Sequence, residues 1–180
     1  VVVVSDSGNK YRFRNSADSA TFAQSAVTIN LQEQGTYVFD WSDSTAQGHP
    51  IRFSTTSDGT HGGGSEYTTG VVKDDSAYKT TITIASGVAN LYYYCQNHSG
   101  MGAEINTNTL HGSTNFDGSI TSIVQTNSTS GLSIIKYVGT GSALSFGHEL
   151  GSKPKLAILK DRDADSTNWI ILDTVASDQG

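Results

Sequence analysis

The sequence predicts an all-β protein, and three observations support this prediction. Short runs of strand-forming residues recur along the chain, separated by turns rich in Ser, Asp, Gly and Asn. The 180 residues include 19 Gly and 2 Pro, and 16% are charged, a composition that suits short strands joined by many turns. No segment has the apolar periodicity of an amphipathic helix. Regular strand spacing with turn signals between the strands points to a β-sandwich.

The first part of the chain is expected to hold a series of short strands, each an apolar or β-branched run bounded by turn residues. These strands are predicted over Val1–Val4, Lys10–Arg14, Ala26–Leu31, Thr36–Asp40, Ile51–Ser54, Lys79–Ile84 and Asn90–Tyr94. The run from Thr80 alternates apolar and polar residues, and the run from Leu91 is dense in aromatic β-formers, so each has one face for a core. Residues 55–70 read as a long Gly/Ser/Thr loop, and a loop of that length is expected to be functional or well packed.

The composition changes from about Asn106 to Ser130, where Thr, Asn, Ser and Gly dominate. We therefore predict a first domain over 1–105, a junction over 106–130 and a smaller β module over 131–180. One strand is expected within the junction, over Ser119–Gln125. The module's strands are expected over Leu132–Val138, Ala143–Phe146, Lys155–Lys160 and Asn168–Asp173, with Trp169 and Ile170–Leu172 in a core strand. Because the chain begins with Val and stops soon after a strand-like run, we expect a segment of a longer protein with a truncated second module.

Charge and cysteine content narrow the functional class. The net charge of −6 argues against a general nucleic-acid binder, which would carry a basic patch. No apolar run approaches the length of a membrane-spanning helix, so membrane insertion is not expected. The single Cys cannot form an internal disulfide, so stability is expected to come from the β core, from partner chains or from a metal.

The most informative motif holds the only Cys and the only Met of the chain, three residues on either side of a His. The soft thiolate of Cys95, the imidazole of His98 and the weak thioether of Met101 are ligand types that suit copper in a trigonal electron-transfer site. Such a site needs one more His, and His49, just before the run Ile51–Ser54, is the candidate. Two alternatives stay open: Cys95 and Met101 could be ordinary core residues, or the same site could hold zinc.

Other polar groups point less clearly to a site. Asp58 and His61 lie in a loop without the clustered carboxylates that calcium needs, so a structured turn with a His near the site is favoured. His148 and Glu149 would form an acid/base pair, but no nucleophile stands near them in the sequence, and a turn or interface role is favoured. The cluster Asp161–Asp165 is expected to be a solvated turn with local ion pairs rather than a calcium site.

Residues 1 to about 105 resemble a cupredoxin, a small β-sandwich domain that binds type 1 copper. The resemblance rests on the early His followed by Cys-x-x-His-x-x-Met after an aromatic-rich strand. It implies a Greek-key β-sandwich in which His49 and His98 are imidazole ligands, Cys95 is the thiolate and Met101 is the weak axial ligand. Pro50 departs from the pattern, because cupredoxins often have Asn after the early His. Proline lacks a backbone donor, so the bracing of the ligand loop must differ here.

More narrowly, the first part of the chain is similar to repeats in structural proteins of marine tailed phages, and the second part resembles a β module of phage tail or fibre proteins. The first similarity is carried by Tyr37-x-Phe39-Asp40, Gly48-His49-Pro50-x-Arg52-Phe53-Ser54, Asp58-Gly59-Thr60-His61, and Tyr94-Cys95-x-Asn97-His98-Ser99-Gly100-Met101-Gly102. The second is carried by Ser133–Tyr137, Gly139, Gly141, Gly147-His148-x-Leu150-Gly151-x-x-Pro154-Lys155, Lys160-x-Arg162 and Trp169. The similarity implies a structural component of a bacteriophage virion, from its tail, fibre or capsid surface, with a fibre-type second module.

This interpretation carries expectations about partners and location. We expect a homo-oligomer that contacts other virion proteins in the extracellular particle, and a host-surface glycan or receptor as a further partner. Two other functions compete: a copper electron-transfer protein of the bacterial periplasm, envelope or cell surface, and a host-glycan-binding fibre module. Trp41 is compatible with sugar binding, although a core or interface role is also open. An enzyme is not expected, because an axial thioether leaves no open position on the metal for a substrate.

Overall fold

The computed structural model describes residues 1–15, 17–18, 20–107, 112–164 and 166–173. Over these ranges the protein is all-β, as the sequence predicts, and the one helical element described is a short 3-10 turn, η1 (Gly59–Gly62). The chain divides into two compact units. The first comprises Val1–Gln125 and Ile134–His148, and the second comprises Thr126–Ser133 and the residues from Glu149 onward. That the parts 1–105 and 131–180 fold as separate domains stays a prediction.

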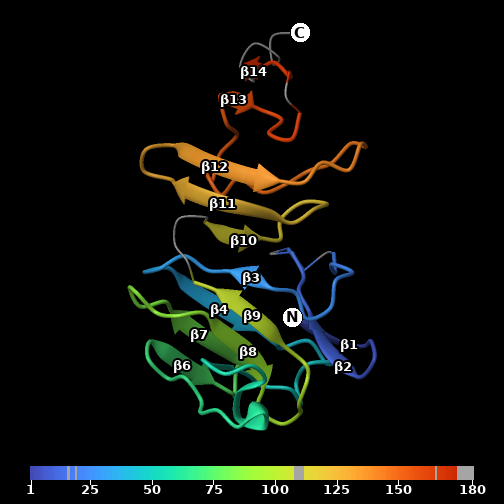
Figure 1. The fold of residues 1–180 in the computed structure, drawn as a ribbon, viewed down its shortest axis with the longest axis vertical. Helices are drawn as coiled ribbons and strands as arrows, with labels where there is room; N and C mark the ends of the chain where they lie inside the picture. The colour runs from blue at the N-terminus through green and yellow to red at the C-terminus, as the bar shows by residue number, and fades with distance from the viewer. Residues whose placement is uncertain (16, 19, 108–111, 165, 174–180) are drawn as a thin grey trace. The chain divides into compact units, whose positions relative to one another are not determined.

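Two sheets and a hairpin build most of the first unit (Figure 1). The four-stranded sheet has the order β3-β9-β8-β5 and the three-stranded sheet has the order β4-β7-β6. Every pair in these sheets is antiparallel except β3 with β9, which run parallel. The strands are β1 (Val2–Ser5), β2 (Asn9–Arg12), β3 (Ile29–Asn30), β4 (Thr36–Asp40), β5 (Ile51–Ser54), β6 (Val71–Asp74), β7 (Lys79–Thr83), β8 (Leu91–Cys95) and β9 (Ala103–Asn106), with β1 and β2 forming the hairpin.

The core follows from alternation along these strands, because successive side chains of a strand point to opposite faces. In β4, Phe39 is buried whereas its neighbour Val38 is exposed. In β8, Leu91, Tyr93 and Cys95 lie two residues apart and all belong to the hydrophobic core. Edge-to-face aromatic pairs, such as Phe39 with Phe53 at a 5.1 Å centroid distance, fill the layer.

The end of β8 is buried on both faces. Tyr94 points away from Tyr93 and Cys95, yet it is also fully buried. Gly59 of η1 lies so close to the Tyr94 ring that a β-carbon on Gly59 would come within 2.4 Å of it. The η1 loop therefore covers the outer face of the strand that carries Cys95, and the long loop expected over residues 55–70 is a packed one.

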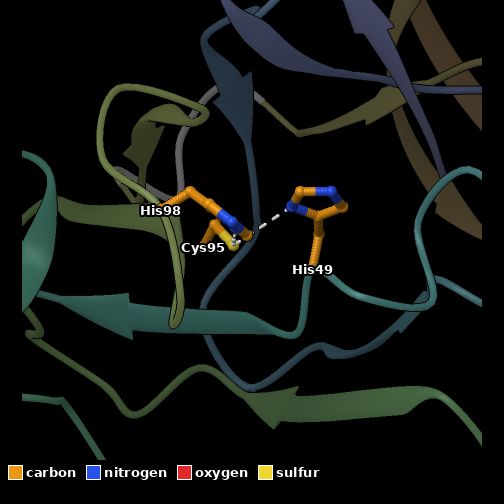
Figure 2. A group of neighbouring side chains, drawn as sticks. All are labelled: His49, Cys95 and His98. Atoms are coloured by element: carbon orange, nitrogen blue, oxygen red, sulfur yellow. Dashed lines mark hydrogen bonds between the residues drawn. The ribbon is translucent and has the colours of Figure 1, made fainter.

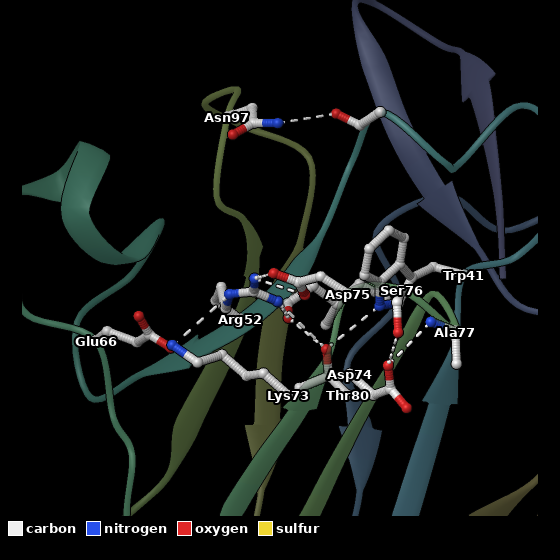
Figure 3. A network of polar contacts seen from close by, with 12 residues as sticks. Trp41, Arg52, Glu66, Lys73, Asp74, Asp75, Ser76, Ala77, Thr80 and Asn97 are labelled. Atoms are coloured by element: carbon white, nitrogen blue, oxygen red, sulfur yellow. Dashed lines mark hydrogen bonds and ion pairs between the residues drawn. The ribbon is translucent and has the colours of Figure 1, made fainter.

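A buried arginine links the two sheets (Figure 3). Arg52 on β5 is 2% exposed, and its Nη2 donates to both carboxylate oxygens of Asp75, at 2.8 and 2.7 Å. Asp75 lies in the turn between β6 and β7, so this ion pair joins one sheet to the other. Thr80 of β7 donates to the Ile51 carbonyl and accepts from Trp41 Nε1. Trp41 is fully buried in this network, which makes it a core residue and not a sugar platform.

Three strands were not predicted from the sequence. β6 reads Val-Val-Lys-Asp and lies within a stretch of turn residues, and β9 and β10 (Ser113–Asn115) are short and rich in polar residues. Their pairing comes from partner strands, with β6 held on β7 and β9 held between β3 and β8. The local sequence pattern therefore gives little indication of these three strands. β10 lies within the predicted junction, which thus contains a strand in addition to the one expected there.

The strand expected over Ala143–Phe146 is wrong. Phe146 forms an isolated bridge to Gly118, and the rest of the segment is not in a strand. The Ser145 carbonyl accepts the backbone N–H of Ser119, and the Ser145 N–H donates to the Ser119 hydroxyl. The segment thus bonds to a turn instead of a strand, so no ladder can extend along it.

The remaining strands are β11 (Ser122–Asn127) and β12 (Leu132–Tyr137), which form a sheet in the order β10-β11-β12, and the antiparallel pair β13 (Leu156–Leu159) and β14 (Ile170–Asp173). The expectation that Trp169 and Ile170–Leu172 lie in a core is wrong, because Trp169 is 65% exposed and all residues of β14 are exposed. Among the described residues these two strands pair only with each other, and an isolated strand pair leaves its faces open to solvent. No helix in the described ranges is long and apolar enough to cross a membrane.

Candidate metal centre

Strand pairing brings the early His to the Cys. Ile51 at the start of β5 pairs with Cys95 at the end of β8, and the pairing continues outward with the Gln96 N–H donating to the Pro50 carbonyl at 2.9 Å. In an antiparallel pair this register places His49 opposite the residues just after Cys95. His49 is therefore delivered by the backbone ladder, while His98 returns to Cys95 through the short loop that follows β8.

The three side chains converge on one point (Figure 2). Cys95 Sγ lies 3.7 Å from His49 Nδ1 and 3.7 Å from His98 Nδ1. The ligand atoms of the three residues all lie within 4.8 Å of one another. Cys95 is fully buried, His49 is half-buried and His98 is exposed, so the site lies at the surface end of the core.

Met101 is the fourth predicted ligand, and it is fully buried in the same core cluster as Cys95. Its backbone carbonyl accepts the Tyr11 N–H at 3.0 Å, which ties the end of the ligand loop, residues 95–101, to β2. The thioether is thus held within the apolar core and not at the surface. Met101 therefore shares the buried core with Cys95, whose sulfur belongs to the converging group of three.

Electrostatics favour neutral imidazole at His49. Burial disfavours the imidazolium and the neighbouring His98 adds repulsion, and together they lower the pKa of His49 below its ordinary value of 6.5. At neutral pH the ring therefore keeps a lone pair for a metal. Burial raises the pKa of Tyr11 far above its usual range, so Tyr11 stays a neutral hydroxyl donor beside the site.

Two side chains that the sequence did not single out brace the His49 segment. The Tyr11 hydroxyl donates to the His49 carbonyl at 2.7 Å. Asn97 Nδ2 donates to the Gly48 carbonyl at 3.1 Å, which joins the ligand loop to the segment before His49. Both contacts hold the segment directly before Pro50, whose nitrogen has no hydrogen to donate. The position of Asn97 between Cys95 and His98 could have suggested its role, but nothing in the sequence pointed to Tyr11.

The donor set determines which ions fit. One thiolate and two imidazoles are soft to borderline donors, of kinds found in copper sites. Zinc also accepts Cys and His ligands, but it gains nothing from a thioether. The group contains no carboxylate, so calcium and magnesium do not fit. The three residues therefore fit a soft or borderline ion, such as copper or zinc, and not a hard one.

The other candidate residues do not form a comparable group. Within the described ranges, the His49–Cys95–His98 group is the one cluster of three His, Cys, Asp or Glu residues that could hold a metal. Asp161 and Asp163 lie in an exposed turn in which the Asp163 N–H donates to Asp161 Oδ1, and Asp165 lies outside the described residues. His148 is half-buried and Glu149 is exposed, and the division of the chain into its two units falls between them.

Comparisons with known proteins add a limited result. A family model described as a domain of unknown function, DUF7483, matches residues 96–179. The match begins directly after Cys95, so it includes His98 and Met101 but neither Cys95 nor His49. No curated protein and no solved structure matches the chain.

Proposed function

We propose that the first unit of this protein binds one copper ion through His49, Cys95 and His98, with Met101 as a weak axial ligand. The observation that carries the proposal is the convergence of one sulfur and two imidazole nitrogens within 4.8 Å. Residues 49 and 95 are far apart in sequence, and only the β5–β8 pairing joins them. A cysteine that serves only as a core residue needs no histidine beside it, whereas a metal site of this kind needs the thiolate and the imidazoles together.

The bound ion would supply one-electron redox chemistry, and the protein's residues would set its environment. Cys95 at the end of a buried strand is rigid, and His49 is held through its carbonyl by Tyr11. The aromatic core around Tyr93 excludes water from the sulfur side. A thioether in the axial position leaves no place for a substrate, which supports a non-enzymatic role.

We further propose that this unit is a stable building block in a structural protein of a bacteriophage virion. Support comes from the sequence similarity to phage structural repeats and from the all-β architecture. The exposed apolar side chains of β13 and β14 are suited to contact another chain, as expected in a homo-oligomer within a particle. They are Leu156, Ile158, Ile170, Ile171 and Leu172. A soluble electron carrier of the periplasm has less support, because such an apolar surface has no use in a freely diffusing protein.

The copper proposal is tested by absorption spectroscopy after Cu(II) is added to the full chain in the absence of oxygen. We expect an intense thiolate-to-copper band near about 600 nm at a ratio of one copper per chain. Cys95→Ser should abolish the band, because serine supplies no thiolate. Thr45→Ala serves as a control, since Thr45 lies near His49 in sequence but outside the group. A wild-type protein that binds no copper, or binds it without this band, would contradict the proposal.

The structural role is tested separately. Antibodies against the chain, applied to purified phage particles, should label the particle, and mass spectrometry should find its peptides there. Detection in a bacterial periplasmic fraction without particles would favour the electron-transfer alternative. Binding to host glycans by the isolated protein would favour the glycan-binding alternative.

A further inference from the structure

The loop that covers Tyr94 also contacts the ligand loop directly, at both ends. We define the ligand loop as residues 95–101 and the bracing loop as residues 55–64. Asp58 Oδ1 accepts the Gly100 N–H at 2.8 Å, although the two residues are 42 positions apart. His61 Nε2 lies 3.0 Å from the Cys95 carbonyl oxygen, and its ring stands edge-on to Tyr94. His98 lies between these two points of attachment.

The ligand loop has few other means of holding its shape. Residues 96–100 are all exposed, so no apolar side chain anchors them in the core. At its two ends, backbone hydrogen bonds hold it: the Gln96 N–H donates to the Pro50 carbonyl and the Met101 carbonyl accepts the Tyr11 N–H. Between them its fixed points are Asn97 to Gly48, Lys10 Nζ to the Gly100 carbonyl, and the two contacts from the bracing loop. The peptide groups around Gly100 are therefore held from one side by a lysine of β2 and from the other by the carboxylate of Asp58.

The local backbone shows how Asp58 reaches Gly100. Asp58 precedes η1 with φ 58° and ψ 17°, in the left-handed region, which Asp and Asn adopt more readily than most residues. Gly59 follows with φ 55° and packs against the Tyr94 ring. Because Gly59 is fixed against β8, the carboxylate next to it is fixed relative to the ligand loop.

We propose that Asp58 is a positioning residue that holds the ligand loop in its metal-binding shape before a metal arrives. The hydrogen bond to Gly100 fixes the turn between His98 and Met101, and His61 fixes the Cys95 end of the same loop. The consequence for copper rests on the proposed function, whereas the effect on the loop itself does not. Hydrogen-bonded neighbours that orient metal ligands commonly change metal affinity by about 10-fold to 100-fold.

Two variants at one position separate the hydrogen bond from the backbone conformation. Asp58→Gly keeps the left-handed conformation available and removes the acceptor. Asp58→Asn keeps an acceptor oxygen and also tolerates this conformation. Any difference between them therefore reports the contact with Gly100 and not backbone strain.

The first measurement is hydrogen exchange of the Gly100 amide by NMR in the full, metal-free chain. We expect exchange about tenfold faster in Asp58→Gly and close to wild type in Asp58→Asn. Unchanged Gly100 exchange in Asp58→Gly would overturn the proposal. Amides of β4 and β7 should exchange as in the wild type in both variants, which shows that the fold is intact.

The second measurement is copper binding by the same proteins. We expect Asp58→Gly to bind Cu(II) about tenfold more weakly, with a weaker thiolate band and a changed copper hyperfine splitting in the electron paramagnetic resonance spectrum. Asp58→Asn should restore both. Equal affinity and equal spectra in the three proteins would overturn the role of Asp58 at the site. A wild type without the copper band would instead contradict the proposed function, and the exchange experiment would still decide whether Asp58 holds the loop.

Discussion

Asp75→Asn is expected to lower the free energy of unfolding of the first unit by about 3 kcal/mol. The reason is the asymmetry of the ion pair. Arg52 is 2% exposed and Asp75 is 57% exposed, so the substitution leaves a buried guanidinium charge with weaker compensation. Removing one partner of a buried ion pair typically costs about 3–5 kcal/mol, and the exposure of Asp75 places this pair at the low end.

Replacing the arginine of this ion pair should lower the free energy of unfolding less than replacing the aspartate. Arg52→Met removes the buried charge and leaves Asp75 free to be solvated, because that carboxylate is already largely exposed. Arg52 Nε has no hydrogen-bond partner among the described residues and only a long ion pair to Glu66 Oε1 at 3.9 Å, so a poorly compensated donor is removed with it. Removing one partner of an ion pair is costly when it leaves the other charge buried, and here the charge left behind is the exposed carboxylate of Asp75. We therefore expect Asp75→Asn to be the more destabilising variant of the two.

Urea denaturation at pH 7 tests this order. The unfolding signal should come from Trp41, which lies within the network, in a Trp169→Phe background that removes the second tryptophan. Lys73→Met is the control, because it breaks the more exposed Lys73–Glu66 pair and should cost less than about 1 kcal/mol. If Arg52→Met is at least as destabilising as Asp75→Asn, packing of Arg52 and not its charge dominates.

Gly102→Ala is the second substitution with a large expected effect. A β-carbon at Gly102 would lie 1.8 Å from the Tyr93 carbonyl oxygen and 2.7 Å from its carbonyl carbon. Both are backbone atoms of β8, so the clash cannot be relieved by turning a side chain. The β8–β9 hairpin would have to open, and we expect a loss of about 3 kcal/mol or more in the free energy of unfolding.

The same change should disturb the proposed copper site, because Gly102 directly follows Met101. Moving this segment would displace the Met101 thioether relative to Cys95, so the copper band should weaken or shift together with the loss of stability. Gly48→Ala is the matched control: it lies next to His49, and a β-carbon there would meet nothing within 4 Å. Equal stabilities for Gly102→Ala and Gly48→Ala would contradict the close approach to Tyr93.

Part of the fold could be predicted because runs of strand-forming residues between turn residues mark several strands in the local sequence. The strands expected over Thr36–Asp40 and Ile51–Ser54 have the same bounds in the structure. β-branched and aromatic residues with turn signals on both sides leave little doubt about such segments. β6, by contrast, has no pattern of its own, and its state depends on pairing with β7. Trp169 looked like a core residue because it is large and apolar, yet it is exposed on a two-stranded pair.

The candidate site divides in the same way. The sequence by itself determined that a thiol, an imidazole and a thioether lie within seven residues, since the covalent chain keeps Cys95, His98 and Met101 together. It could only suggest His49. The tertiary structure decided that His49 lies next to Cys95 and His98, because the register of β5 on β8 brings two distant segments together. It also decided that Asp58 contacts Gly100, since that contact depends on how η1 packs against Tyr94, and no local pattern encodes such packing.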